Sequence, residues 1–169
     1  MRSYLIGPLT RFGLAVAAVA CLLDQASKLY LLFVFDLANH PLRLGPYFDF
    51  VLTRNTGISY GLFQTQGAIG QWVLLGFKAL AVLLLWLWLA RSRDRLTALS
   101  LGLIVGGAVG NAIDRLAYGW VADFVFFHVS TATWQFRWYV FNLADVAIVA
   151  GVISLLYESL AGERAQKAP

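Results

Sequence analysis

Two aspartates lie in strongly apolar stretches of the sequence, where a charged side chain is costly. Asp123 belongs to "GWVADFVFFHV" and Asp145 to "FNLADVAIVAG", and neither has a basic residue three or four positions away. Desolvation and mutual repulsion raise the pKa of at least one carboxyl in a close pair, so that one is protonated while the other is ionised. Two carboxylates that share a proton are the general acid and base of aspartic proteolysis. The residues alone leave a second interpretation open, two independent acids or a cation site.

Charged residues also occur in other apolar segments, and each is a candidate functional residue because ionisable groups inside a membrane are costly. Asp24 and Lys28 are four positions apart and so share one face of a helix. They are expected to form a self-neutralising pair that locks the first helix to its neighbours. Asp114 and Arg115 are adjacent and point different ways, so each is expected to pair elsewhere. The expected partner of Arg115 is Asp24 or an ionised Asp145.

A serine mechanism is a weaker alternative. "GISYG" at residues 57–61 matches G-x-S-x-G, and His40 or His128 would serve Ser59 as the base. That motif works on a strand-turn-helix at the top of a large soluble sheet, which this sequence does not predict. Both histidines are expected to be ordinary loop or interfacial residues.

The composition indicates a membrane protein. Of the 169 residues, 60% are hydrophobic and 13% are charged, which is too little charge for the polar shell of a soluble domain. The apolar residues form long blocks, and runs of about 18 or more are typical of membrane helices. The sequence predicts four spans, at roughly 12–34, 69–90, 96–113 and 138–160. We therefore expect a single integral membrane domain over residues 1–169, an all-α bundle of four transmembrane helices.

Basic residues set the expected orientation of these spans. With the N-terminus inside, the inner segments carry seven of them, whereas the two outer loops, which are longer together, carry four. Both termini are therefore expected in the cytoplasm. The net charge of +4 then mostly reflects anchoring beside anionic lipid, with no need for nucleic acid. In this topology most of the intramembrane polarity faces the outer half of the bilayer.

Two other classes of membrane protein are alternatives to a peptidase, and the distribution of polarity bears on the first of them. A small ion- or proton-coupled transporter would use Asp24, Lys28 and Asp145 as a relay, but it needs carboxylates through the whole depth of the bilayer. A non-enzymatic membrane subunit would tolerate replacement of Asp123 and Asp145 without loss of activity. Both alternatives stay open on the residues alone.

The first 23 residues resemble a signal peptide, with Arg2 and Arg11 before an apolar run. Apolar sequence resumes after Lys28 and continues to Val34, so we expect this segment to be retained as the first span. Cys21 is the only cysteine, which leaves no internal disulfide to form.

Five motifs occur in a fixed order along the chain: "LLDQASK", "TRNTGISYG", "GGAVGNAIDR", "VADF" and "FNLAD". Together they resemble lipoprotein signal peptidase (signal peptidase II), a family of bacterial intramembrane aspartic proteases. The resemblance implies four spans with both termini cytoplasmic. It also implies a small periplasmic β-cradle in the first outer loop, with strands from "PLRLGPYFDFVLT", and a short amphipathic helix near Ile58–Gln64.

The resemblance further implies the chemistry and its residues. The catalytic pair is Asp123 and Asp145. The substrate is a prolipoprotein carrying a diacylglyceryl cysteine, cut just before that cysteine, with no metal or cofactor. The enzyme is expected to be a monomer among the lipids of the bacterial cytoplasmic (inner) membrane, with its active site near the outer face. Residues implied to bind substrate or support the pair are Asp24, Lys28, Asn55, Gly107, Asn111, Asp114, Arg115 and Asn142.

Overall fold

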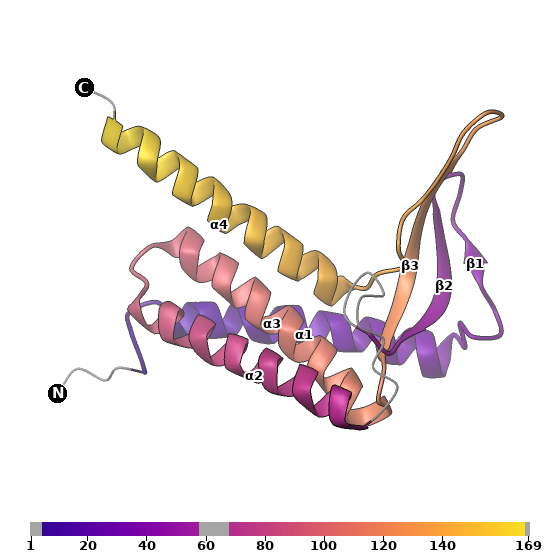
Figure 1. Ribbon diagram of the computed structural model, residues 1–169, viewed down its shortest axis with the longest axis horizontal. Helices are drawn as coiled ribbons and strands as arrows, with labels where there is room; N and C mark the ends of the chain where they lie inside the picture. Colours follow the sequence, from indigo (N-terminus) through magenta and orange to yellow (C-terminus); the bar gives the residue numbers. More distant parts are fainter. Residues whose placement is uncertain (1–4, 58–67, 168–169) are drawn as a thin grey trace.

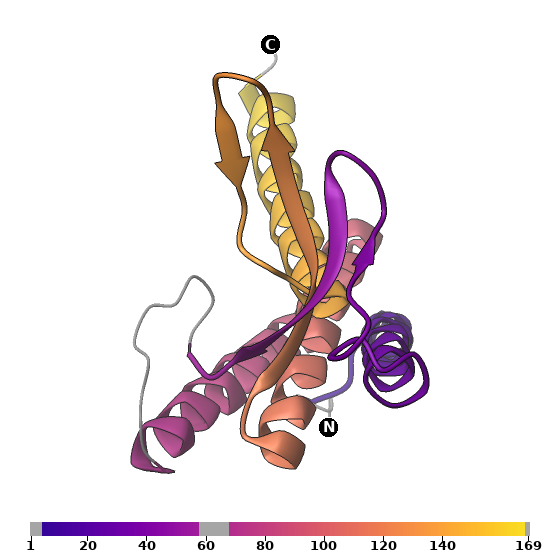
Figure 2. The same cartoon turned by 90° about the vertical axis from the view of Figure 1, so that its right-hand side faces the viewer.

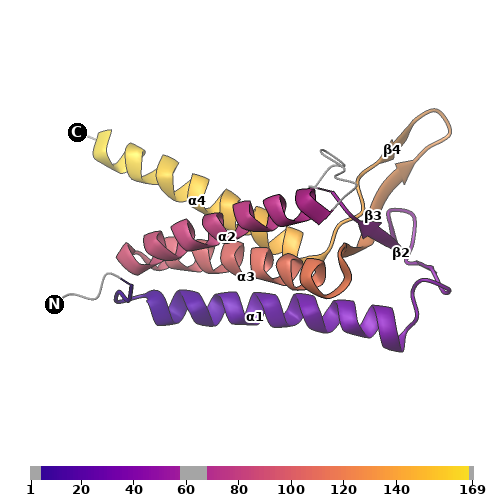
Figure 3. The same ribbon diagram turned by 60° about the horizontal axis from the view of Figure 1, so that its bottom comes forward.

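Four helices and a small antiparallel sheet make up the part of the chain that the computed structural model describes, residues 5–57 and 68–167. Helix α1 (Thr10–Leu29) continues into a π-helical turn, η1 (Tyr30–Val34). It is followed by α2 (Ala68–Arg91), α3 (Arg95–Tyr118) and α4 (Leu143–Lys167). Helix α3 packs against each of the other three helices. Figures 1 and 3 show α1, α2 and α3 side by side, with α4 diverging from them toward its C-terminal end.

Three of these helices are long and apolar enough to cross a membrane: Thr10–Val34, Arg95–Tyr118 and Leu143–Leu160. In α2 the described residues include a shorter apolar stretch, Ala79–Arg91. Each predicted span therefore contains a helix, and the chain is a membrane protein. The crossing of the bilayer by α2 stays a prediction.

Two predicted helix boundaries were wrong. Helix α3 continues past residue 113 to Tyr118 and ends where Gly119 adopts a left-handed conformation (φ 79°), which glycine enters without steric cost. Helix α4 begins at Leu143 rather than at 138. The apolar residues before it are extended instead, because the Phe141 N–H donates to the Val125 carbonyl at 3.0 Å in an isolated bridge to a strand.

The sheet lies beyond one end of the helices (Figures 1 and 2). Its strands are β1 (Leu42–Arg43), β2 (Phe48–Asn55), β3 (Val121–Ser130) and β4 (Gln135–Arg137), in the order β1-β2-β3-β4 and antiparallel throughout. The strands predicted in the first outer loop are present as β1 and β2. The sheet was not confined to that loop, since β3 and β4 come from the connection between α3 and α4. The predicted amphipathic helix near Ile58–Gln64 lies outside the described residues.

Polar and apolar side chains are distributed as lipid surroundings require. Large apolar residues of the helices are exposed, among them Leu22 and Phe33, whereas Asp24, Lys28 and Asn142 are buried between helices. In water the reverse arrangement would be stable, because exposed apolar area is unfavourable there. This inversion agrees with a bundle whose outer surface faces hydrocarbon.

Glycine allows α3 to approach α1 closely. A Cβ at Gly106 would lie 2.9 Å from the Ala17 Cα and in contact with the Ala17 carbonyl oxygen. Since the obstacle is backbone, it cannot yield by a side-chain rotation. We expect Gly106→Ala to lower the free energy of unfolding by about 1–3 kcal/mol, measured by thermal unfolding in detergent. The control is Gly76→Ala in α2, where a Cβ would meet nothing within 4 Å. Equal melting temperatures of the two variants would contradict this close packing of α3 on α1.

Candidate active site

A buried ion triad joins α1 to α3. Lys28 Nζ lies 2.7 Å from Asp24 Oδ2 and 2.9 Å from Asp114 Oδ2. The three side chains are 2%, 0% and 1% exposed, respectively. The predicted pair of Asp24 and Lys28 is therefore confirmed, and Asp114 extends it. Such a group is tolerated in a low-dielectric interior only because opposite charges and hydrogen bonds compensate its desolvation.

Each carboxylate of the triad also accepts a backbone N–H next to one of the two candidate catalytic aspartates. Asp24 Oδ1 accepts from the Ala144 N–H at 2.9 Å, one residue before Asp145. Asp114 Oδ2 accepts from the Ala122 N–H at 3.0 Å, one residue before Asp123. Lys28 thus holds together two carboxylates that fix the start of α4 and the start of β3.

Asn142 connects the two aspartates directly. Its Nδ2 donates to Asp123 Oδ1 at 2.6 Å, and its backbone N–H donates to Asp145 Oδ2 at 3.2 Å. The Asp145 N–H returns a bond to Asn142 Oδ1 at 3.0 Å. This reciprocal pair has the form of a capping box, which satisfies free N–H groups in the first turn of α4. One fully buried amide therefore sets the position of both carboxyl groups.

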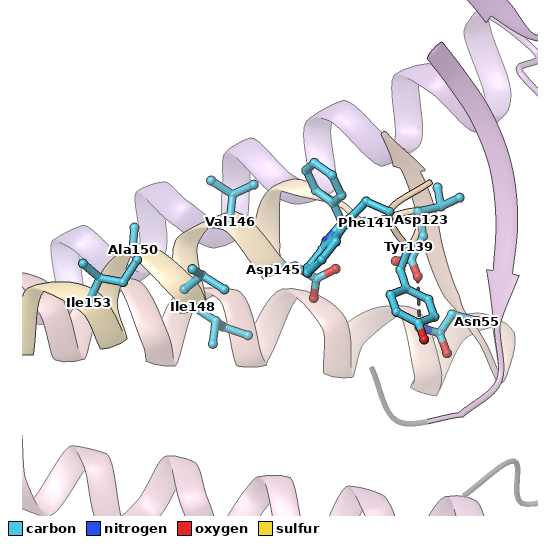
Figure 4. Close-up of a pocket in the computed structure, with 12 residues that line it drawn as sticks. Asn55, Asp123, Tyr139, Phe141, Asp145, Val146, Ile148, Ala150 and Ile153 are labelled. Atoms are coloured by element: carbon cyan, nitrogen blue, oxygen red, sulfur yellow. Dashed lines mark hydrogen bonds between the residues drawn. The ribbon is translucent and has the colours of Figure 1, made fainter. Parts of the chain in front are cut away.

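Two further asparagines complete the hydrogen bonds of the pair. Asn111 on α3 donates from Nδ2 to Asp145 Oδ1 at 2.9 Å, while its Oδ1 accepts from Lys28 at 2.9 Å and from Asn142 at 3.1 Å. Asn55 at the end of β2 donates to Asp123 Oδ2 at 2.9 Å (Figure 4). Both oxygens of each aspartate are accordingly engaged by amide donors.

The electrostatics of Asp123 are unusual for a carboxyl group. Burial raises its pKa to about 6, and the nearby charge of Asp145 acts in the same direction. The hydrogen bonds from Asn55 and Asn142 and the charge of Lys28 oppose this rise. Desolvation exceeds those opposing effects because Asp123 is buried on β3. Asp123 can therefore hold or release a proton near neutral pH.

The predicted pairing of Arg115 was wrong. Its guanidinium forms no ion pair within residues 5–57 and 68–167, and its Nη2 donates to the Gly57 carbonyl. Asp24 and Asp114 both pair with Lys28, and both oxygens of Asp145 accept from amide donors, whereas Arg115 binds the backbone after β2. Its Nε and Nη1 are buried without a hydrogen-bond partner among the described residues. The charges of Asp123, Asp114 and Asp145 act on the Arg115 guanidinium.

Gly107 lets α4 approach α3 beside the pair. A Cβ at this position would contact the Ala144 carbonyl oxygen and lie 2.9 Å from Ile148 Cγ1. Ala144 immediately precedes Asp145, so this close approach contributes to the placement of that carboxyl group. The site as a whole opens into a groove of about 590 Å³ that includes Asn55, Asp123 and Asp145 in its lining (Figure 4).

Comparison with known proteins assigns this arrangement to a family. The model of the peptidase family described as signal peptidase (SPase) II matches residues 16–161. The chain belongs to the signal peptidase II family. Lipoprotein signal peptidases of Nitrobacter hamburgensis and Rhodopseudomonas palustris are 59% and 56% identical to it over 160 residues. Each alignment covers 94% of this chain and 98% of the relative.

Two solved structures share the fold. Both are described as bacterial membrane enzymes determined by the in meso method, at 2.3 and 1.9 Å resolution. They are 20% identical to this chain, with TM-scores of 0.72 and 0.69. The alignments cover 94% of this chain and 92% and 98% of the respective structures. At this identity the similarity concerns the fold alone.

Membership in the signal peptidase II family favours the peptidase interpretation over the transporter and the non-enzymatic subunit. It also disfavours the serine mechanism. Ser59 lies outside the described residues, and His128 Nε2 lies 3.1 Å from Asp49 Oδ2 on the sheet. His40 is exposed beside Asp36.

One residue of the site was missed in the sequence. Gln25 Nε2 donates to Asp114 Oδ1 at 2.8 Å and to the Gly110 carbonyl at 3.0 Å, and lies 3.5 Å from Asp24 Oδ2. It therefore braces both carboxylates of the triad. The available signal was its position in "LLDQASK", where a polar amide directly follows Asp24 in an apolar segment.

Proposed function

We propose that this chain removes signal peptides from prolipoproteins by aspartic proteolysis, with Asp123 and Asp145 as the catalytic pair. The substrate carries a diacylglyceryl group on a cysteine, and the cut falls just before that cysteine. The observation that carries the proposal is the single Asn142, which hydrogen-bonds both aspartates where they line an open groove. Family membership supplies the class of substrate.

The pair acts on a water molecule placed between the two carboxyl groups. Asp145 acts as the base of the pair, and N–H donors of Asn111 and Asn142 bind its two carboxyl oxygens. Asp123 is the partner that supplies the acid, because burial raises its pKa to about 6 and so keeps part of the population protonated near neutral pH. Asp145 takes a proton from water as the oxygen attacks, and Asp123 hydrogen-bonds the scissile carbonyl. Collapse of the tetrahedral intermediate then breaks the C–N bond as the proton passes to the leaving amine.

The supporting residues divide into two groups in this proposal. The triad of Asp24, Lys28 and Asp114 positions the backbone beside each catalytic aspartate. Arg115, whose Nε and Nη1 have no hydrogen-bond partner among the described residues, would orient carbonyl oxygens of the substrate or brace the aspartates. Asn55 positions Asp123 and, through its Oδ1, the Gly57 N–H at 3.0 Å.

The proposed topology has four spans in one domain, with both termini in the cytoplasm and the site at the periplasmic face. The position of the sheet supports this arrangement. Helix α1 begins and α4 ends at the end of the bundle opposite the sheet (Figure 1). Asp123 is in β3 and Asp145 is in the first turn of α4. A monomer is sufficient in this proposal, because every residue of the site comes from one chain. A diacylated substrate reaches the groove from within the bilayer, since withdrawing its chains costs about 0.8 kcal/mol per CH₂.

The experiment that tests the proposal is a gel-shift assay with the purified full chain in detergent micelles. The substrate is a prolipoprotein already modified with diacylglycerol, and we expect its signal peptide to be released. The same precursor with an unmodified cysteine serves as the comparison. No cleavage of the modified precursor by a folded protein would contradict the proposed function.

The raised pKa of Asp123 predicts the pH dependence of this reaction. Below about 6 the carboxyl group is protonated, and above it the pair loses its acid. We therefore expect kcat/KM to fall as pH rises through about 6, measured by the initial rate of the gel shift. Asn55→Ala removes a hydrogen bond that stabilises ionised Asp123, so it should move this fall to higher pH. A rate that stays constant through pH 6 would contradict the role of Asp123 as the acid.

A further inference from the structure

The groove has two chemically different parts. Its polar end holds Asn55, Asp123 and Asp145, whereas its extension along α4 is apolar and includes Val146, Val149, Ile153. We call the last three residues the α4 strip. Val149 and Ile153 follow Asp145 at intervals of four, so all three share a helical face. At about 1.5 Å of rise per residue, the strip extends about 12 Å from the catalytic carboxyl group.

The side chains of the strip are exposed on the surface of α4. Val149 is 52% exposed and Ile153 61% exposed in the structure. Its outer end is walled by the extended residues Tyr139 and Phe141 (Figure 4), so the strip is open toward the bilayer interior. Aromatic side chains of this kind are typical of the membrane interface.

The substrate has two apolar parts, its acyl chains and its signal peptide. The chemistry of the strip indicates which of the two it binds. Next to the scissile bond the peptide is extended, and its N–H and C=O groups need hydrogen-bond partners. The strip offers none, because its side chains are aliphatic and the backbone groups of α4 are bonded within the helix. An acyl chain needs no such partners. The polar side chains that offer hydrogen bonds to a peptide, Asn55, Asp123 and Asp145, are at the other end of the groove.

We propose that the α4 strip binds an acyl chain of the diacylglyceryl group on the substrate's cysteine. This assignment rests on the proposed function, because it places the lipidated residue directly after the scissile bond. The ester end then lies near Tyr139 and Phe141, and the chain runs along Val146, Val149 and Ile153 away from the aspartates. A long acyl chain therefore contacts the whole strip, whereas a short chain contacts only the part nearest the aspartates.

The test compares two synthetic lipopeptides that differ only in the acyl chains, dipalmitoyl and dibutyryl. A four-carbon chain ends before Ile153, whereas a sixteen-carbon chain passes it. Ile153→Trp fills the distal part of the strip. We expect it to raise KM for the dipalmitoyl substrate so that the preference for it over the dibutyryl substrate falls about tenfold, the equivalent of about two buried methylene groups. Val149→Trp, nearer to Asp145, should raise KM for both substrates.

The matched control is Val19→Trp on α1, a valine of similar exposure, 57%, outside the groove. It should leave both KM values unchanged. Cleavage of the dibutyryl substrate by Ile153→Trp shows that this variant is folded. An unchanged preference in that variant, or an equal loss for both substrates, would overturn the assignment, and the equal loss would place the peptide on the strip. Failure of the unsubstituted protein to cleave either lipopeptide would instead contradict the proposed function.

Discussion

Asp123→Asn and Asp145→Asn each lower kcat by about 10³-fold or more, since each removes a group that transfers a proton in the reaction. Asparagine is nearly isosteric with aspartate and retains one oxygen as an acceptor. The fold is therefore expected to persist, and Tm should change little. The measurement is the gel shift under single-turnover conditions together with thermal unfolding.

The two substitutions should also be non-additive. The carboxyl groups act as one unit, so the kcat of the double variant is expected to match that of either single variant within a fewfold range. Asp49→Asn is the matched control, because that carboxylate lies on β2 and pairs with His128 rather than with the site. Ser59→Ala should cleave normally, whereas an inactive, folded Ser59→Ala would revive the serine mechanism. Full activity in either catalytic variant would refute the pair.

Lys28→Met is expected to be the most destabilising single substitution in the bundle. It removes the cation that two buried carboxylates share, at 2.7 and 2.9 Å. Breaking a buried pair by removing one partner costs about 3–5 kcal/mol, because a buried charge is left uncompensated. Thermal unfolding in detergent measures the effect. Exposed Arg93→Met is the control and should melt at the temperature of the unsubstituted protein.

A second readout separates positioning from stability in the same variant. The charge of Lys28 lowers the pKa of Asp123, so its removal should move the fall in kcat/KM to higher pH. Adding Asp24→Asn reduces the buried charge and should restore part of the stability. An unshifted pH profile would leave Lys28 with a structural role only.

The sequence was sufficient for the local features of this fold. Long apolar blocks predicted the helices, and the spacing of Asp24 and Lys28 predicted their ion pair. Both depend on residues close in the chain. The order of five motifs led to the candidate pair, although nothing in the spacing required Asp123 and Asp145 to meet.

The features that escaped prediction depend on contacts between distant segments. The sequence does not predict strand β3, because two helices separate it along the chain from its partner, β2. The apolar residues before Leu143 looked helical, but the bridge between Phe141 and Val125 keeps them extended. The sequence suggests an acid as the partner of Arg115, since no pattern in the chain reveals that Lys28 pairs with both Asp24 and Asp114.

The bond from Ala144 to Asp24 joins residues 120 positions apart. The ribosome therefore delivers α1 long before the residue that completes its hydrogen bond. Before residue 142 is synthesised, the emerging protein lacks Asn142 and Asp145. Asp123 then has no hydrogen bond from the Asn142 amide. The active arrangement forms only when the last helix enters the membrane. A partly synthesised chain therefore lacks the complete pair of carboxyl groups and the amide that joins them.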